Sequence, residues 1–299
     1  MIASRKVSAT EDGVRLSRWI MRYYPGSNKI LIRRLCRSGE IRVNSKRSKI
    51  EDVLRSGDLI RIPPAIANLK KPKRNFQKID FSLADLEKLR KAIIYNDNDI
   101  VIFHKPSGLA VQGGSSIKKS LDKMAIALFP NDTVLLVHRL DKETSGIIVV
   151  AKNQNAAQKL AMDFQSKNIH KEYIALLSGK IKSKEGIIDE PIAGKKAITH
   201  YKVIGELKNY LTIVRFRPET GRKHQLRIHS AKVLGAPIVG DDLYGSRRID
   251  GRVKTFLSLH HLYLFASKIS FRHPKTGKIL TINAIMPEWM KPAITLCEM

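Results

Sequence analysis

The chain has 299 residues, enough for two domains, and 43% of them are hydrophobic, which excludes a wholly disordered protein. Its 55 Lys and Arg against 27 Asp and Glu give a formal net charge of +28, which predicts a polyanionic partner, either nucleic acid or an anionic membrane. No apolar run approaches the roughly 18 residues of a spanning helix, so nucleic acid is favoured and no membrane association is expected. A lysine-rich proteome is an alternative source of the charge.

The two cysteines, Cys36 and Cys297, form no Cys-x-x-Cys pair, so we expect neither a zinc site nor a disulfide framework. Cys36 falls in an apolar helical stretch and is predicted to be in the core. The N-terminus carries Glu11 and Asp12 and lacks an apolar segment, which argues against secretion and favours the cytoplasm. An organellar transit peptide is the alternative.

Residues 1–62 carry 15 Lys and Arg against 6 Asp and Glu, and their pattern predicts two helices followed by short strands. Four apolar residues share one face of the first helix: Leu16, Trp19, Ile20 and Tyr23. We expect the second helix to begin after an N-cap at Ser27 and to end at Gly39. Short strands with turns are expected at three places: 41–43, 44–46 and 57–62.

This order of elements resembles the S4 RNA-binding domain. The resemblance rests on RLSRWI at 15–20, the helix after Ser27, GEIRVN at 39–44 and SGDLIRI at 56–62. It implies a small α-L domain over residues 1–62 whose second helix presents a basic face to RNA phosphates. The candidate phosphate contacts are Arg33, Arg34, Arg37 and Arg42. A solvated helix face is the alternative interpretation.

Residues 63–92 are predicted to join this domain to the rest of the chain. The segment 63–78 contains three prolines and five basic residues but no acidic one, which is typical of an extended linker. Such a linker can also follow a phosphate backbone. A short helix within 79–92 is expected to end it.

From residue 93 onward the pattern changes to alternating strands and helices. Apolar runs at 93–96 and 100–106 predict two strands, and the shared face of Ala156, Leu160, Ala161 and Phe164 predicts a helix from Asn153 to Ser166. Five more strands are expected: 172–177, 198–204, 211–217, 268–272 and 279–285. The pattern predicts a strand-rich mixed domain of helices and strands over residues 93–299.

Residues 138–146, HRLDKETSG, lie between β-branched runs at 134–137 and 147–151 that predict buried strands. Asp141 therefore falls on a tight turn between core strands, beside Arg139 and Lys142. Nearby positive charge favours an ionised carboxylate, which can act as a nucleophile or as an electrostatic stabiliser. A turn or cap residue is the alternative for Asp141.

HRLDKETSG resembles the catalytic signature of the RluA-type pseudouridine synthases, in which the aspartate is the catalytic residue. Further segments resemble other motifs of that family: HKPSGLAVQGG at 104–114, KEY at 171–173, TGRKHQLRIHSA at 220–231 with GAPIVGDDLYG at 235–245, and LHHLYLF at 259–265 with FRHP at 271–274. At 259–261 this chain has Leu-His-His where the family usually has Leu-His-Ala. Together the matches cover 93–287 and imply an α+β protein with a largely antiparallel, bent central sheet and one long cleft.

The resemblance also assigns roles to individual residues. Tyr173 would lie against the target base and Arg227 would pair with Asp141. Arg139 would fill the stack that the flipped base leaves, and Lys105, near glycines of the first motif, would meet the RNA backbone. We interpret three further residues as structural hydrogen-bonding groups: His138, His224 and His229.

Conversion of uridine to pseudouridine breaks the C1′–N1 bond and rejoins the same ring through C5, so neither a cofactor nor a metal is expected. We predict a monomeric enzyme that isomerises uridines in RNA, with large-subunit ribosomal RNA favoured over another ribosomal or transfer RNA site. Two other classes stay open. One is a non-catalytic RNA-binding or ribosome-assembly protein, and the other is a glycosidic hydrolase that uses Asp141 and Glu143.

Overall fold

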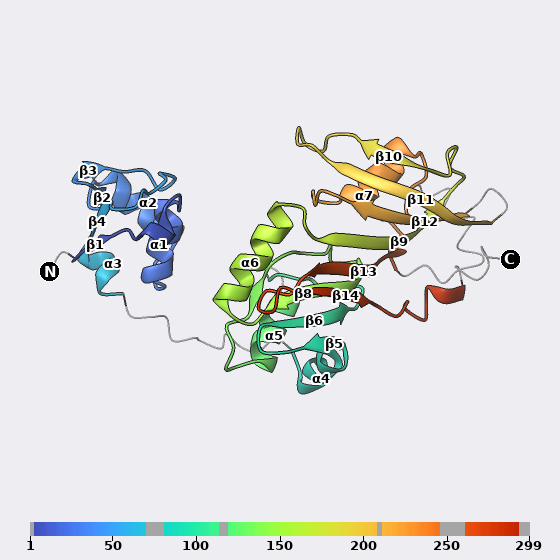
Figure 1. The fold of residues 1–299 in the computed structure, drawn as a ribbon, viewed down its shortest axis with the longest axis horizontal. Helices are drawn as coiled ribbons and strands as arrows, with labels where there is room; N and C mark the ends of the chain where they lie inside the picture. Colours follow the sequence, from blue (N-terminus) through green and yellow to red (C-terminus); the bar gives the residue numbers. More distant parts are fainter. Residues whose placement is uncertain (1–2, 70–80, 114–118, 208–210, 246–260, 293–299) are drawn as a thin grey trace. The chain divides into compact units, whose positions relative to one another are not determined.

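The computed structural model describes residues 3–69, 81–113, 119–207, 211–245 and 261–292. The chain divides into two units, Met1–Ile79 and Asp80–Met299. The α+β class predicted from the sequence is confirmed, with a small antiparallel sheet in the first unit and a mixed, mainly antiparallel sheet in the second (Figure 1). None of the helices within these ranges is long and apolar enough to cross a membrane.

The first unit is built from a small sheet and the helices that pack with it. Its strands pair antiparallel in the order β1-β4-β2-β3. In chain order its elements are β1 (Ala3–Lys6), the 3-10 turn η1 (Ala9–Glu11), α1 (Leu16–Tyr23), α2 (Lys29–Arg37), β2 (Arg42–Val43), β3 (Lys46–Arg47), β4 (Leu59–Ile62) and the short helix α3 (Pro64–Ala67).

The core of the first unit follows the helical spacing of its apolar residues. Leu16, Trp19 and Ile20 of α1 are fully buried, which confirms the predicted apolar face. Cys36 of α2 is also buried, as expected, and packs with Ile32. Burial of these side chains fixes the inner face of α2, so its polar residues are left on the outer face.

The N-cap of α2 is Asn28, and the prediction of Ser27 is wrong. The side chain of Asn28 accepts a hydrogen bond from the backbone N–H of Leu31 at 2.9 Å. Ser27 belongs to the preceding turn, where its hydroxyl donates to the carbonyl of Tyr24 at 2.6 Å. Both residue types cap helices well, so only the path of the chain decides between them.

Two further expectations for this region need correction. Asn44 and Ser45 have φ of 50° and 66° and form the turn between β2 and β3, so only Lys46 of the strand expected at 44–46 lies in a strand. The linker expected to be extended from residue 63 begins as the helix α3, with Pro64 in its first turn and Ile66 fully buried in the first unit. Proline fits the first turn of a helix because no intrahelical partner is needed there. Residues 70–80 lie outside the described residues.

The second unit holds the predicted strands and helices at nearly the predicted positions. In chain order they are α4 (Leu83–Lys91), β5 (Ile93–Asn96), β6 (Ile100–Lys105), α5 (Leu121–Leu128), β7 (Leu135–Leu136), β8 (Ser145–Ala151), α6 (Gln154–Gln165), β9 (His170–Ser178), β10 (Glu185–Asp189), β11 (Ile198–Leu207), β12 (Leu211–Pro218), α7 (Gln225–Ile228), the π-helical segment η2 (His229–Val233), β13 (Leu264–Arg272) and β14 (Ile279–Asn283).

The central sheet runs β10-β11-β12-β9-β13-β8-β6-β5, with β14 on β13 and β7 on β8. All neighbouring pairs among these strands are antiparallel except β13 and β8, which are parallel. Strands that are distant in sequence therefore lie side by side at the middle of the sheet (Figure 1). This pairing places the loop before β8 close to Tyr173 and Ile174 in the middle of β9.

Strands β6 and β8 are continuous apolar runs because both faces of the sheet are covered there. On one face Val101 and Phe103 pack in a cluster with residues of α4 and α5. On the other face Ile100 and Ile102 pack in a cluster with Leu160 of α6 (Figure 1). The loop that carries Asp141 is thus attached to a strand that is buried along its whole length.

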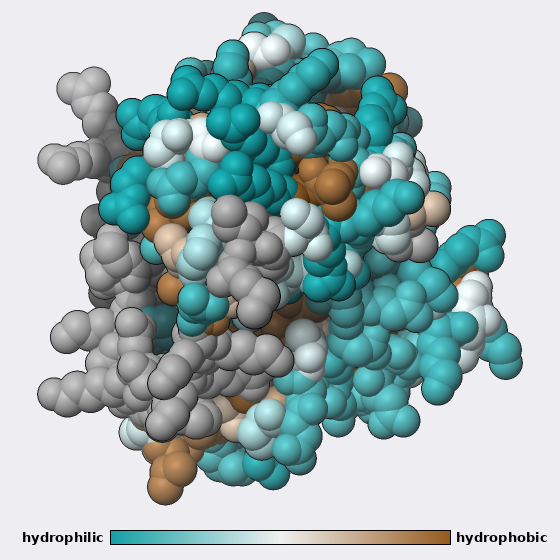
Figure 2. All heavy atoms as spheres, turned by 90° about the vertical axis from the view of Figure 1, so that its left-hand side faces the viewer, coloured by the Kyte–Doolittle hydropathy of each residue, from teal (hydrophilic) through white to brown (hydrophobic). Residues whose placement is uncertain are grey.

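Apolar side chains are scattered over the described surface rather than gathered in one patch. Hydrophilic residues dominate the face drawn in Figure 2, where the apolar ones form small separate groups. Exposed apolar side chains such as Ile30, Leu83 and Ile285 belong to different elements or loops. Isolated apolar residues of this kind are usual on protein surfaces.

Candidate active site

Asp141 lies on the loop between β7 and β8, at the wall of a cavity of about 690 Å³. Its side chain is 22% exposed, so the carboxylate can be reached from this cavity. Tyr173 of β9, Arg227 of α7 and Arg139 line the same cavity. The structure therefore brings together four predicted site residues from three separate segments of the sequence.

Lys105 is fully buried at the end of β6, and it holds the loop of Asp141 in place. Its ammonium group donates to the carbonyls of Pro106, Leu109 and Lys142 at 2.8–2.9 Å. These acceptors match the three protons of an ammonium group. Burial lowers the pKa of Lys105 to about 7, while the charges of Glu143 and Asp141 oppose this shift.

This position does not suit the RNA contact expected for Lys105. A side chain with no exposed surface and three backbone partners cannot meet a phosphate without leaving them. Lys105 instead ties the turn after β6 to the loop of Asp141. The sequence places Lys105 beside a predicted glycine turn, and that pattern does not indicate that the side chain is buried.

Arg227 is buried beside Asp141 but is bound mainly to another carboxylate. Its Nε and Nη2 atoms donate to the two oxygens of Asp241 at 2.7 and 2.6 Å. Its Nη1 atom lies 4.0 Å from Oδ2 of Asp141. The expected proximity of Arg227 and Asp141 is present, and the strong bidentate pair is the one with Asp241.

Asp241 is a residue of this site that the sequence reasoning missed, although GDDLYG was one of the quoted motifs. Its side chain has no exposed surface, and it also accepts from the backbone N–H groups of Leu243 and Tyr244. Burial alone would raise the pKa of Asp241, but the hydrogen bonds from Arg227 and these amides outweigh it and lower the pKa. Asp241 therefore stays ionised and fixes the guanidinium group.

Tyr173 faces the cavity from β9 as a protonated phenol. Burial raises its pKa, and the negative charge of Asp141 raises it further. At neutral pH the hydroxyl can donate a proton or a hydrogen bond but cannot act as a base. The ring provides a flat apolar surface at the cavity wall, as expected for a residue that contacts a base.

Two cations at the cavity have no acidic partner among the described residues. Arg139 is exposed and forms no ion pair there. Lys171 is partly buried on β9, two residues from Tyr173, and burial lowers its pKa. A cation at the wall of a cavity without a counter-charge favours an anionic ligand.

Two of the three histidines in these motifs have the structural role expected of them. His138 accepts from the backbone N–H of Val149 at 2.9 Å, and burial lowers its pKa to about 3. His229 is fully buried between the hydroxyl of Thr199 and the carbonyl of Glu190. The third, His224, instead faces Asp141 across the cavity.

The two carboxylates predicted for a glycosidic hydrolase, Asp141 and Glu143, do not meet at this cavity. Asp141 lines it, but Glu143 does not, and the carboxylate of Glu143 pairs with Lys142 at 3.5 Å. Two carboxyl groups must flank one bond in such hydrolases. The structure therefore gives no support to a hydrolase that uses Asp141 and Glu143.

The four arginines expected to contact RNA in the first unit differ in their surroundings. Arg34 and Arg37 are exposed on the outer face of α2, and Arg33 is exposed but lies 3.7 Å from Glu51. Arg42 is half-buried and donates to the carbonyls of Gly39 and Ser45, so it holds the β2–β3 turn. Arg34 and Arg37 are the most accessible pair.

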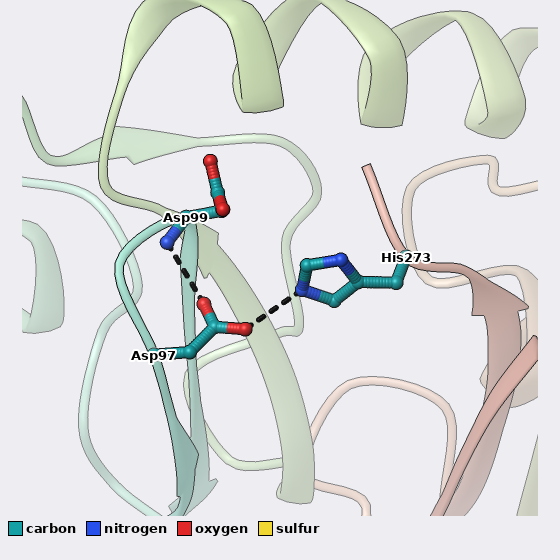
Figure 3. Close-up of side chains that lie close together, drawn as sticks. All are labelled: Asp97, Asp99 and His273. Carbon is teal, nitrogen blue, oxygen red and sulfur yellow. Dashed lines mark hydrogen bonds and ion pairs between the residues drawn. The ribbon is translucent and has the colours of Figure 1, made fainter. Parts of the chain in front are cut away.

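A separate cluster of Asp97, Asp99 and His273 has the residue types of a metal site (Figure 3). One oxygen of Asp97 accepts from the backbone of Asp99, and the other accepts from His273 at 2.7 Å. The second ring nitrogen of His273 accepts from the backbone of Lys275. These atoms are committed to hydrogen bonds that connect the β5–β6 turn with the β13–β14 turn, which fits a structural role.

The cavity combines an accessible carboxylate, a buried arginine, a protonated tyrosine and unpaired cations. These features are typical of an active site that takes an anionic substrate. Residues 99–232 match the family model described as RNA pseudouridylate synthase, and this range contains Asp141, Tyr173 and Arg227.

Curated relatives match almost the whole chain. A protein named ribosomal large subunit pseudouridine synthase C from Escherichia coli (strain K12) is 36% identical over 303 residues, covering 95% of this chain and 93% of its own. A protein of the same name from Pasteurella multocida (strain Pm70) is 35% identical over 302 residues, covering 95% and 90%. The chain therefore belongs to the RluA-type family of RNA pseudouridine synthases, isomerases that convert uridine in RNA to pseudouridine.

Solved structures agree with this fold. The structure of human RNA pseudouridylate synthase domain containing 4 superposes with a TM-score of 0.60 at 24% identity, covering 71% of this chain and 95% of that one. At this identity the likeness shows the fold alone.

Proposed function

We propose that this protein isomerises specific uridines in large-subunit ribosomal RNA. The observation that carries the proposal is the extent of the match to proteins named for that substrate, which covers 95% of the chain. A match of that extent must include most of the first unit as well as the catalytic one. The first unit, which we propose to help select the RNA substrate, is thus shared along with the second unit.

The proposed chemistry centres on Asp141. The C1′–N1 bond of the target uridine breaks, the base turns, and C5 bonds to C1′ while its proton leaves and N1 gains one. An accessible carboxylate at the cavity wall can attack C1′ or assist departure of the base. Arg227, fixed by Asp241, supplies a positive charge 4.0 Å from Asp141, and Tyr173 supplies the surface against which the base lies.

The target base must leave its helix before it can enter the cavity, which costs on the order of a few kcal/mol. We assign Arg139 to this step. Its side chain is exposed at the cavity and is not held by an acidic group of the described chain. A planar guanidinium can stack in the vacated position and also meet phosphates.

We further propose that residues 1–62 form an S4 RNA-binding domain, that 63–92 join it to the catalytic domain, and that 93–299 carry catalysis. The residues proposed to act on the base belong to the second unit of one chain, so a monomer is sufficient. The similarity to bacterial enzymes supports a cytoplasmic site of action.

Replacing both Arg34 and Arg37 by Ala should weaken RNA binding and flatten its salt dependence. Each lost phosphate contact should reduce the slope of log affinity against log salt by roughly 0.7–0.9. The matched control changes Lys46 and Arg47 of β3 to Ala, the same loss of charge in the same unit. Titrations of labelled RNA at several salt concentrations measure the slopes, and equal slopes for both double variants would contradict a specific role of α2.

The substrate is tested by mapping pseudouridines in RNA from cells that lack this protein, with and without a restored gene. We expect particular positions in large-subunit ribosomal RNA to lose the modification and to regain it on restoration. A chain restored with Asp141→Asn should bind RNA but leave the positions unmodified. Loss confined to transfer RNA or small-subunit RNA would overturn the substrate assignment while keeping the reaction.

A further inference from the structure

His224 has a backbone conformation that non-glycine residues rarely adopt. Its φ of 55° and ψ of 25° lie in the left-handed region, at the residue that precedes α7. Its side chain forms no capping hydrogen bond with that helix. The conformation instead places the imidazole at the wall of the cavity, where only 15% of the side chain is exposed. Unusual backbone conformations of this kind gather at functional sites.

The two ring nitrogens of His224 face two different groups. Nδ1 lies 3.0 Å from the hydroxyl of Tyr244, and Nε2 lies 3.8 Å from Oδ1 of Asp141. Arg227 approaches the other oxygen of Asp141, with Nη1 at 4.0 Å from Oδ2. Each oxygen of the carboxylate is therefore approached by one nitrogen donor from the segment around α7.

The negative charge of Asp141 favours one tautomer of His224. If the tyrosine hydroxyl donates to Nδ1, the proton of the neutral ring lies on Nε2 and points toward the carboxylate. The opposite arrangement would place a lone pair of Nε2 against a negative charge. Burial lowers the pKa of His224; the charge of Asp141 opposes this shift and the charge of Arg227 adds to it. The neutral ring is therefore favoured, and in the neutral ring only one nitrogen carries a proton that can face Asp141.

We propose that His224 is a positioning residue for the reaction, which orients the carboxylate of Asp141 through its Nε2 proton while Tyr244 holds the ring. The inference rests on the proposed role of Asp141 as the reacting group. His224 acts on Oδ1 and Arg227 on Oδ2, so the carboxylate keeps one orientation as the base breaks away from C1′ and turns. A neutral donor restrains the carboxylate without adding a second full charge beside it.

His224→Ala should lower kcat on the order of 10- to 100-fold with little change in KM, because misplacement of a reacting group mainly affects the chemical step. His224→Gln keeps an N–H group near the position of Nε2 and should recover a large part of kcat. Tyr244→Phe should lower kcat by a smaller factor. In the double variant of His224→Ala with Tyr244→Phe, the second change should cost almost nothing, because the hydroxyl acts through the ring.

The matched control is His229→Gln, a second histidine of the same segment whose hydrogen bonds are all structural. It should lower the melting temperature while the folded fraction keeps the kcat of the wild type. Steady-state release of tritium from C5-labelled uridine in RNA measures kcat and KM, and thermal melting reports folding. If His224→Ala and His229→Gln lose activity only in proportion to folding, or if His224→Gln is no better than His224→Ala, the positioning role is overturned. An active Asp141→Asn variant would instead overturn the proposed function itself.

Discussion

Replacement of Asp141 by Asn is expected to reduce pseudouridine formation by at least about 1000-fold, since removal of the group that reacts with substrate usually costs this much. The amide has nearly the shape of the carboxylate but is a poor nucleophile and a poor base. The affinity of the variant for RNA should stay within a few-fold of the wild-type affinity, because only one side chain at the cavity wall changes and the basic surface is unaltered. Tritium release and filter binding measure the two quantities.

The control for Asp141→Asn is Glu143→Gln, which makes the same change of charge two residues away. Glu143 does not line the cavity, so its variant should keep activity close to that of the wild type. Residual activity of more than a few per cent in Asp141→Asn would contradict the assignment of Asp141. A large loss in Glu143→Gln would reopen the paired-carboxylate alternative.

Asp241→Asn is expected to have the second largest effect, on both stability and turnover. The change breaks a bidentate pair whose side chains are 0% and 7% exposed and leaves the charge of Arg227 without its partner. Losing one member of a buried pair typically costs about 3–5 kcal/mol of unfolding free energy. Turnover should fall as far as in Arg227→Ala, because in both cases the charge beside Asp141 is lost or misplaced. Chemical denaturation and tritium release measure the two effects.

The variant Arg139→Ala distinguishes the loss of turnover in Asp241→Asn and Arg227→Ala from a general loss of positive charge at the cavity. A substrate whose target uridine is already unstacked avoids much of the extrusion cost and should partly restore Arg139→Ala. The same substrate should not restore Asp241→Asn or Arg227→Ala. Equal restoration of all three variants, or of none, would show that extrusion and catalysis are not divided in this way.

The order of elements could be predicted along most of the chain, because local spacing determines which faces are apolar. The spacing of Leu16, Trp19 and Ile20 predicted one buried face, and the apolar run of β8 predicted a strand covered on both sides. The ends of elements were less certain. Ser27 and Asn28 are both good caps, and Pro64 fits a linker as well as a first helical turn, so the chain path chose between them.

The site residues were predictable as types but not as partners. HRLDKETSG indicated Asp141, and the later motifs indicated Tyr173 and Arg227, which the fold places at one cavity. The ion pair between Arg227 and Asp241 was not predictable. The two residues are 14 positions apart and joined through a turn, so their spacing does not determine whether they touch. Lys105 was expected at the RNA, yet it is buried under the Asp141 loop.

The sequence by itself determined the basic character of the protein, the two-unit order and the segments that carry its chemistry, because these depend on composition and on local periodicity. The tertiary structure decided which charges meet. Pairing of β9 with β13, and of β13 with β8, brings Tyr173 to the loop of Asp141, and the segment around Asp241 brings a carboxylate to Arg227. Burial and distance then set the strength and protonation of each group, and both depend on contacts between residues far apart in the chain.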